Sequence, residues 1–196
     1  MMLGARTAAW AKIGAPLPYD AEVEYLESNG NRYIDTGIKA DYGLIYRVDA
    51  ETFINAGCVF GAYDRRVLMQ INIDSYVLYN TSRIVRNPSG FRVGVRCEEI
   101  LGPNIYKHDG VSLPATFGTE NVNSNVVLFG RSENTSYSQN FKGRIFGFSI
   151  SLNGNEIIDF IPVKKDGLGY MYDSVSGHLF GEVYARPFVI GPDKTT

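Results

Sequence analysis

The residues with the clearest potential for binding chemistry lie in two polar segments, each of which follows an apolar strand ending in Phe-Gly. These segments are VFGAYDRR (59–66) and LFGRSENT (128–135). Their similarity suggests two strands that leave the fold at comparable positions. Tyrosine rings can lie against the apolar faces of sugars, while Asp, Asn and Arg side chains hydrogen-bond to hydroxyl groups. The residues expected to contact a ligand are Tyr63, Asp64, Arg65, Arg131, Asn134 and Tyr137.

The carboxylates do not follow the pattern of a hydrolytic site. Retaining glycosidases place an acid/base and a nucleophile about 5 Å apart, and β-sandwich glucanases carry both on one E-x-D-x-E or E-x-D-x-x-E strand. The acidic run from Asp20 to Glu27 lacks the central Asp. Glu98 and Glu99 are adjacent, so a strand would point them to opposite faces. We therefore expect no enzymatic activity.

The histidines and cysteines also lack the spacing of a catalytic or zinc-binding set. His108 and His178 adjoin Asp-Gly and Ser-Gly turns, so we expect both to be exposed turn residues. Cys58 and Cys97 lie in apolar runs with no C-x-x-C and no Cys/His ligand pattern, so we expect no zinc site. Two free buried thiols are one reading of the cysteines. A disulfide is the other, and it requires that their strands be neighbours.

Calcium is the remaining cofactor question. Sandwich domains can hold Ca²⁺ at a loop rim through carboxylate, amide and backbone oxygens. No spaced ligand motif occurs, so we predict no cofactor and leave calcium open. The available oxygen ligands are Asp64, Asp74, Asn134 and Asp173.

The composition is that of an all-β protein. The 196 residues include 13 Tyr, 11 Phe and 21 Gly, 20% are charged, and the formal net charge is −2. One β-sandwich with a short extension accounts for this length. No basic stripe stands out, which argues against a nucleic acid as the main partner.

Short strand-like segments separated by turn signals follow one another from Glu22 onward, and no long helical pattern occurs. Such a series is typical of a two-sheet antiparallel sandwich or jelly roll, with a barrel as the alternative. The expected strands are Val23–Leu26, Arg32–Asp35, Leu44–Phe53, Cys58–Ala62, Val67–Ile73, Tyr76–Tyr79, Phe91–Arg96, Asn104–Lys107, Val126–Phe129, Arg144–Leu152, Glu156–Ile161, Gly169–Tyr172, His178–Phe180 and Pro187–Ile190.

One hairpin carries the clearest local signal. Apolar residues alternate with Gly and Ser up to Leu152, which predicts a half-buried strand. Asn153-Gly154 follows, and this pair favours a type I′ turn because both central residues of that turn have positive φ. The residues expected in the core are Phe146, Phe148, Ile150 and Ile157.

The two-residue loop sets the expected register of the return strand. Ile150 should face Ile157, and Asp159 should fall on the same face as Phe148. We interpret Asp159 as a partner for a backbone N–H in a nearby loop, with a ligand or metal carboxylate as the alternative. Pro162 cannot donate to a ladder, so the strand should end or become an edge there.

Residues 1–19 differ from the rest of the chain and are interpreted as an arm that precedes a sandwich domain at 20–193. The segment from Gly14 to Pro18 is a stiff linker. Trp10, the only tryptophan, is either an exposed anchor for a partner surface or folded back on its own domain. The arm residues expected to contact a partner are Arg6, Trp10 and Lys12.

The N-terminal segment contains no apolar run of the length that a signal peptide requires. No stretch is long and apolar enough to be a transmembrane helix. We therefore expect neither an export signal in this chain nor a membrane as its partner, and the sequence leaves homo-oligomerisation open.

Three segments carry a family resemblance. EYLESNGNRYIDTGI (24–38), FKGRIFGFSISLNGNEIIDFIP (141–162) and GLGYMYDSVSGHLF (167–180) resemble, in order and spacing, the concanavalin A-like, laminin-G-type jelly-roll modules of bacterial surface and phage proteins. The resemblance covers about residues 22–192. It implies a two-sheet jelly-roll sandwich. Modules of this kind bind glycans, proteins or no known ligand.

The opening MMLGARTAAWAK is similar to short arms that begin virion proteins of tailed phages infecting gut Bacteroidales. A virion protein is released by lysis and needs no export signal. Together the resemblances imply a non-catalytic protein of the virion surface, which decorates the capsid or tail or attaches to the host. Residues 1–19 would bind other virion proteins. The alternative is a carbohydrate-binding, lectin-like adhesion module on a bacterial cell surface.

Overall fold

The computed structural model describes residues 16–41, 43–54, 56–62, 67–72, 75–79, 92–113, 123–133, 136–138 and 140–195. Within these ranges the chain forms eighteen strands and no helix. No helix of this part of the chain is therefore available to span a membrane. Every strand pairing is antiparallel. The prediction of an all-β antiparallel protein is confirmed.

The strands form sheets of eleven, five and two strands. The main path of the largest sheet is β10 (Val111–Ser112), β9 (Ile105–His108), β8 (Arg96–Gly102), β4 (Ile45–Thr52), β14 (Lys142–Leu152), β15 (Asn155–Lys165), β16 (Leu168–Asp173) and β17 (Leu179–Phe180). Its remaining strands are β1 (Ala21–Glu22) beside β15, and β2 (Leu26–Asn29) between β14 and β18 (Val189–Ile190). The second sheet runs β3 (Ile34–Lys39), β11 (Asn125–Leu128), β5 (Gly57–Gly61), β6 (Leu68–Asn72) and β7 (Ser75–Tyr79). The smallest sheet pairs β12 (Arg131–Glu133) with β13 (Ser136–Ser138).

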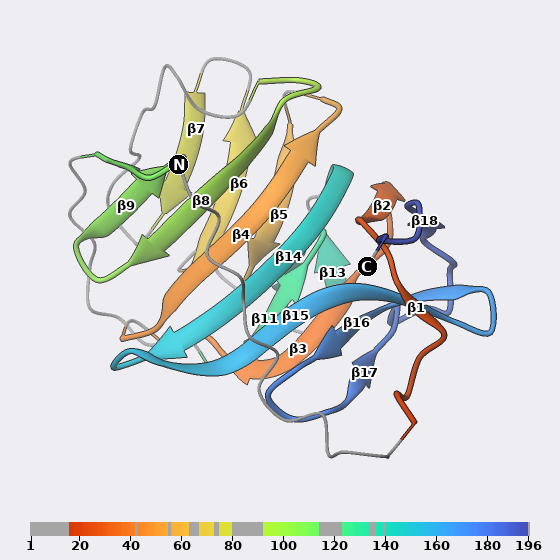
Figure 1. The fold of residues 1–196 in the computed structure, drawn as a ribbon. Helices are drawn as coiled ribbons and strands as arrows, with labels where there is room; N and C mark the ends of the chain where they lie inside the picture. The colour runs from red at the N-terminus through yellow and green to blue at the C-terminus, as the bar shows by residue number, and fades with distance from the viewer. Residues whose placement is uncertain are drawn as a thin grey trace.

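The two larger sheets pack face to face, and the core lies between them. In Figure 1 the largest sheet lies in front of β5, β6 and β7. Phe60 on β5 stacks on Tyr46 of β4, with ring centroids 5.4 Å apart, and lies 5.3 Å from the ring of Phe148 on β14. All three side chains are buried. The two-sheet part of the sandwich prediction is confirmed by these contacts between the sheets.

The turn between β14 and β15 has the predicted geometry. Asn153 has a φ of 52° and Gly154 a φ of 81°, so both central residues are left-handed. Leu152 pairs with Asn155, as a two-residue loop requires. The local chemistry of Asn-Gly is sufficient to specify this turn.

A β-bulge changes the register predicted beyond the turn. Ile150 pairs with Ile158 instead of Ile157, and Phe148 pairs with Phe160. The bulge moves Ile158 and Phe160 onto the core face, where both are buried. It also moves Asp159 to the face opposite Phe148, which keeps a carboxylate out of the apolar core. The predicted positions of Ile157 and Asp159 are therefore wrong.

A second irregularity lies on the other edge of β14. Its register with β4 shifts between Ile145 and Gly147, so Phe146 has no direct partner there. Ile145 takes the core position, while Phe146 is half-buried. The prediction of burial is confirmed for Phe148 and Ile150 and is wrong for Phe146 and for Ile157, which is also half-buried.

β15 runs through Pro162 to Lys165 instead of ending there. The strand changes partners at this point, since its pairing with β14 stops at Phe160 and β1 takes over. The carbonyl of Pro162 accepts a hydrogen bond from Val23 N at 3.0 Å. A proline is tolerated at this position because it falls where one neighbouring strand leaves and another arrives.

The first and last described segments lie side by side next to β15, beyond the point where its pairing with β14 ends. Asp20 N donates to Lys164 O at 2.8 Å, and Lys194 N donates to Glu22 O at 2.9 Å. The ring of Tyr19 lies 5.0 Å from that of Tyr172. Tyr19, which the sequence assigned to the arm, therefore packs on the sandwich, and the boundary between arm and domain stays a prediction.

Candidate functional site

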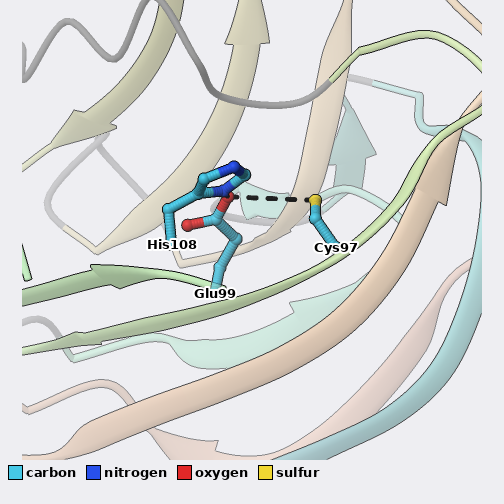
Figure 2. A group of neighbouring side chains, drawn as sticks. All are labelled: Cys97, Glu99 and His108. Atoms are coloured by element: carbon cyan, nitrogen blue, oxygen red, sulfur yellow. Dashed lines mark hydrogen bonds and ion pairs between the residues drawn. The ribbon is translucent and has the colours of Figure 1, made fainter. Parts of the chain in front are cut away.

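The hairpin of β8 and β9 brings together a cysteine, a glutamate and a histidine. Glu99 and His108 are paired directly across the two strands. Cys97 precedes Glu99 by two residues on the same strand, so its side chain lies on the same face. Figure 2 shows the carboxylate of Glu99 beside the imidazole of His108, with the thiol of Cys97 directed toward them. We call these three residues the Cys–Glu–His cluster.

The strand that carries this cluster was predicted in the wrong place. Residues 92–95 form an exposed turn, and β8 begins only at Arg96. Glu98 faces outward and forms an ion pair with Arg47, whose Nε lies 2.6 Å from Glu98 Oε2. Glu99 faces inward. The expectation that adjacent glutamates lie on opposite faces is confirmed, and the outward ion pair explains how a strand accommodates both.

Glu99 lies in the interior of the sandwich. Its side chain is 0% exposed, against 16% for His108. On the other side β4 places Val48 opposite Glu99 and Ala50 opposite Cys97, and both of these residues are fully buried. The carboxylate is therefore enclosed by apolar side chains on one side and the imidazole on the other.

The donor atoms of the cluster are close to one another. His108 Nδ1 lies 2.6 Å from Glu99 Oε1, and a hydrogen bond joins them. Cys97 Sγ lies 3.9 Å from the same oxygen. One sulfur, one oxygen and one nitrogen ligand atom lie within 4.8 Å of each other. Among the described residues, none donates a hydrogen bond of ordinary length and angle to Glu99 Oε2, although the side chain of Tyr106 lies near the carboxylate.

A second carboxylate lies near the imidazole. Asp109 Oδ2 is 3.7 Å from His108 Nε2, and Asp109 Oδ1 accepts a hydrogen bond from Glu98 N at 2.8 Å. His108 thus lies between two carboxylates and is largely buried, so the prediction of an exposed turn residue is wrong for it. The prediction is confirmed for His178, which is exposed.

Burial dominates the proton affinities in the cluster. It raises the pKa of Glu99 to about 7, although hydrogen bonding to His108 and the nearby side chain of Tyr106 oppose the shift. Burial also raises the pKa of the Cys97 thiol, and the neighbouring Glu99 carboxylate adds to this effect. A thiol with a raised pKa is protonated at neutral pH, so Cys97 is not an activated nucleophile in this environment.

The cluster combines the ligand types that zinc prefers: a thiol, a carboxylate and an imidazole. The expectation that no Cys/His ligand set exists is wrong, because these three residues share no linear motif and come together only through strand pairing. A usable signal was present in the Pro103-Asn104 turn. The pairing of Gly102 with Ile105 around that turn places position 99 opposite position 108.

Most of the residues predicted to bind a ligand lie outside the described part of the chain. This applies to Tyr63, Asp64, Arg65 and Asn134, and also to Arg6, Trp10 and Lys12 of the arm. Arg131 lies on β12 and Tyr137 on the paired strand β13, where Tyr137 is opposite Ser132. The structure therefore brings the strands of Arg131 and Tyr137 together, and the grouping of all six residues stays a prediction.

The two Phe-Gly strand ends do not leave the fold at comparable positions. β5 and β11 are antiparallel neighbours, with Gly61 opposite Val127 and Phe60 opposite Leu128. Their C-terminal ends therefore point in opposite directions. After β11 the chain turns back at Phe129, which has a φ of 63°. The similar sequences reflect similar local strands and not a shared rim.

Of the four oxygen ligands available for calcium, Asp173 is the one that the structure describes; Asp64, Asp74 and Asn134 lie outside its ranges. The Asp173 carboxylate is buried and accepts hydrogen bonds from Asp159 N (2.9 Å), Val175 N (3.2 Å) and Ser176 N (3.1 Å). These bonds organise the turn after β16. Asp159 itself accepts a hydrogen bond from the Ser174 hydroxyl at 2.9 Å, and the backbone partner stays a prediction.

The outer face of the largest sheet carries a cluster of aromatic rings and arginines. The guanidinium of Arg144 lies 4.3 Å from the ring centroid of Tyr25 and 5.1 Å from that of Phe53. Arg96 lies 3.9 Å from the ring of Phe146. Carboxylates of Glu27, Glu51 and Asp49 balance the two arginines. We call this group the outer-face cluster; the sequence did not reveal it because alternation placed Phe146 inside.

Both cysteines are free and buried. Cys58 lies on β5 in the second sheet, and its thiol donates a hydrogen bond to Phe60 O at 2.9 Å. Cys97 lies on β8 in the largest sheet. Of the two alternatives, free buried thiols are confirmed.

Comparison with known proteins adds no family to this description. No protein-family model matches the chain, and no curated protein matches it significantly.

Proposed function

We propose that this chain is a non-catalytic attachment module of the concanavalin A-like jelly-roll type, anchored to the particle of a tailed phage by residues 1–19. The placement of the three resembling segments carries the proposal. Segment 24–38 supplies β2 and β3, segment 141–162 supplies β14 and β15, and segment 167–180 supplies β16 and β17. All three therefore belong to the sandwich and none is a peripheral insertion.

The boundary of the sandwich supports a separate role for the arm. The buried core draws on residues between Val23 and Phe188. The hydrogen bonds that tie the N-terminal strand to the sheet begin at Asp20. We assign residues 1–19 to a partner on the particle because their opening, MMLGARTAAWAK, resembles the arms of virion proteins.

Deleting residues 1–19 tests this assignment. The shortened chain should keep the melting temperature of the full chain to within a few degrees, because the core is unchanged. It should no longer be incorporated into particles, while the full chain is. Incorporation of the shortened chain at the level of the full chain would overturn the proposal.

Trp10 provides a direct readout of the arm, because it is the only tryptophan. If the arm is an anchor, the fluorescence of the isolated chain should be that of a solvent-exposed indole and should shift to the blue when particles are added. A blue-shifted emission in the isolated chain would instead support an arm folded on its own domain. The Trp10→Phe variant supplies the background for both measurements.

A second candidate function is binding of surface glycans. The outer-face cluster supports it, since Tyr25, Phe53 and Phe146 present half-buried rings beside arginines. A glycan array of the full chain tests this function. Loss of binding in Tyr25→Ala would place the glycan on the outer-face cluster, whereas loss in Tyr137→Ala would place it among the residues predicted from sequence. No binding at high concentration would exclude this second function.

A further inference from the structure

We propose that Cys97, Glu99 and His108 form a binding site for a single thiophilic divalent cation, with Zn²⁺ as the best-matched ion. The site lies inside the sandwich on the β8–β9 hairpin, on the face of the largest sheet opposite the outer-face cluster. It is independent of the attachment function proposed above.

The separation of the cysteine and glutamate ligand atoms is close to that of a tetrahedral zinc site. Zn–N and Zn–O bonds of about 2.1 Å and a Zn–S bond of about 2.3 Å place ligand atoms roughly 3.3–3.8 Å apart. Cys97 Sγ and Glu99 Oε1 are 3.9 Å apart. His108 Nδ1 and Glu99 Oε1 are 2.6 Å apart, so the ion would replace their hydrogen bond and separate them by about 1 Å.

The carboxylate supplies an independent argument for a ligand. Glu99 is fully buried, and its side-chain partners among the described residues are His108, Cys97 and Tyr106, none of which is a lysine or an arginine. Burying a carboxylate beside Val48 and Ala50 is unfavourable unless a partner compensates for the lost hydration. A divalent cation held by Glu99, Cys97 and His108 would provide that compensation.

The backbone holds the three ligands in place before an ion arrives. Glu99 and His108 are paired residues, and the ladder continues through Ile100–Lys107 to the turn at Pro103-Asn104. Cys97 is held by its pairing with Ala50 on β4. A site built on paired strands has little conformational entropy to lose on binding. The ion would displace the thiol proton of Cys97 to solvent, so that cysteine binds as the thiolate. The proton between His108 Nδ1 and Glu99 Oε1 would leave to solvent or move to Nε2 of the same imidazole, which frees both atoms to bind.

The chain supplies a matched control for every ligand. It has two cysteines and two histidines, so Cys58→Ser and His178→Ala remove the same groups elsewhere. Glu98→Gln neutralises the adjacent glutamate, which faces outward. The ligand variants are Cys97→Ser, Glu99→Gln and His108→Ala, and circular dichroism of each metal-free variant establishes whether it is folded.

The first experiment titrates Zn²⁺ into the full chain after metal has been removed and the thiols have been reduced. We expect one ion per chain. Each ligand variant should bind more weakly by more than the roughly 10- to 100-fold that loss of a residue supporting a ligand costs. Each control should stay within about 3-fold of the unaltered chain, a change small against that loss. Failure of the unaltered chain to bind Zn²⁺ would overturn the proposal, and so would equal binding by ligand and control variants.

The second experiment needs no ligand variant to fold. Co²⁺ added to the unaltered chain should give the near-ultraviolet charge-transfer band of a thiolate–cobalt bond. This band should persist in Cys58→Ser. Its absence from the unaltered chain, or its loss in Cys58→Ser, would show that Cys97 is not the ligand and would overturn the site.

Discussion

Nδ1 of His108 lies 2.6 Å from Oε1 of Glu99, and the glutamate side chain is completely buried. The pair joins two adjacent strands from within the sandwich. A carboxylate buried beside Val48 and Ala50 is energetically unfavourable unless its partners replace the lost hydration. The effect of this buried carboxylate on the free energy of unfolding can be measured as a function of pH.

The stability of the metal-free protein should fall as pH rises through the range in which Glu99 ionises. Burial raises the pKa of Glu99 in the folded state from 4.5 to about 7, so the folded state holds this proton more tightly than the unfolded chain does. Ionisation of Glu99 lowers the free energy of unfolding above the unfolded pKa, and this loss grows until about pH 7. At about 1.4 kcal/mol for each unit of pKa, the total loss of stability is roughly 3 kcal/mol. Urea denaturation between pH 4.5 and 8 measures it.

Two variants isolate the contribution of this glutamate. The free energy of unfolding of the unaltered chain minus that of Glu99→Gln should decrease by about 2–3 kcal/mol across this range. Glu98→Gln is the comparison, because Glu98 lies on the opposite face of the same strand beside Arg47. A difference for Glu99→Gln that stays constant or increases with pH would contradict the assignment.

Replacement of Phe148 by alanine should destabilise the protein more than replacement of any other residue in β14. Its ring contacts Phe60 of the opposite sheet at 5.3 Å and Phe160 at 6.3 Å. Phe148→Ala should lower the free energy of unfolding by about 3–5 kcal/mol through lost burial and the cavity left behind. Leu152→Ala is the matched control from the same strand, because Leu152 is 40% exposed, and it should cost less than about 1 kcal/mol. Equal costs for the two variants would argue against the register described here.

The turn could be predicted from sequence, while the register beyond it could not. Asn153 and Gly154 specify positive φ by their own chemistry, and no distant residue is required. The bulge at Ile157 depends on tertiary burial. Ile157 and Ile158 are both apolar, so the sequence favours neither register. The core selects the register that buries Phe160 and leaves Asp159 outside.

The candidate site was missed for a related reason. Cys97, Glu99 and His108 share no linear motif, and each has an ordinary explanation when considered alone. Only the pairing of β8 with β9 brings position 99 opposite position 108. Glu98 and Glu99 also made β8 difficult to predict. Two adjacent charged residues are unusual in a strand that has only one face in contact with solvent.

Gly154 should tolerate only residues that accept a left-handed backbone. Its φ is 81°, and a Cβ at this position would meet no atom within 4 Å, so any penalty arises from the backbone and not from crowding. Gly154→Val should destabilise the domain by about 1–3 kcal/mol, because a β-branched residue is strained at positive φ. Gly154→Asn should cost clearly less, since asparagine adopts this conformation readily. Thermal unfolding of the two variants gives the comparison, and a larger loss for Asn would contradict the turn.

The carboxylate of Asp173 should contribute more to the free energy of unfolding than a carboxylate at the surface does. Its two oxygens accept backbone hydrogen bonds from Asp159, Val175 and Ser176. Asp173→Asn keeps the shape but turns an amide donor toward at least one backbone N–H. We expect a loss of about 1–3 kcal/mol, which is typical of a hydrogen bond to a buried charged group.

Asp193→Asn is the control for that variant. Asp193 pairs with Lys164 at the surface, and exposed ion pairs contribute at most about 1 kcal/mol. Urea denaturation of both variants should therefore show the larger loss for Asp173→Asn. Equal losses would mean that the turn after β16 is held by other contacts.

The contribution of Arg144 to folding stability should depend on the planar shape of its guanidinium as well as on its charge. It lies over the rings of Tyr25 and Phe53, and its Nε and Nη1 contact Glu27 at 2.8 Å and Glu51 at 3.2 Å. Lysine keeps the charge but cannot stack as a plane or reach both carboxylates in the same geometry. Arg144→Lys should lower the free energy of unfolding by about 1–2 kcal/mol, the combined scale of one cation–π contact and one partly buried ion pair.

Arg47→Lys provides the comparison for Arg144→Lys. Arg47 forms an ion pair with Glu98 on the same sheet, and its side chain is 41% exposed. Its replacement should cost no more than about 0.5 kcal/mol, as is usual for a solvated ion pair. If the two lysine variants are equally stable, the aromatic rings contribute nothing to the outer-face cluster. Its arginines would then be available to a ligand without any loss of folding stability.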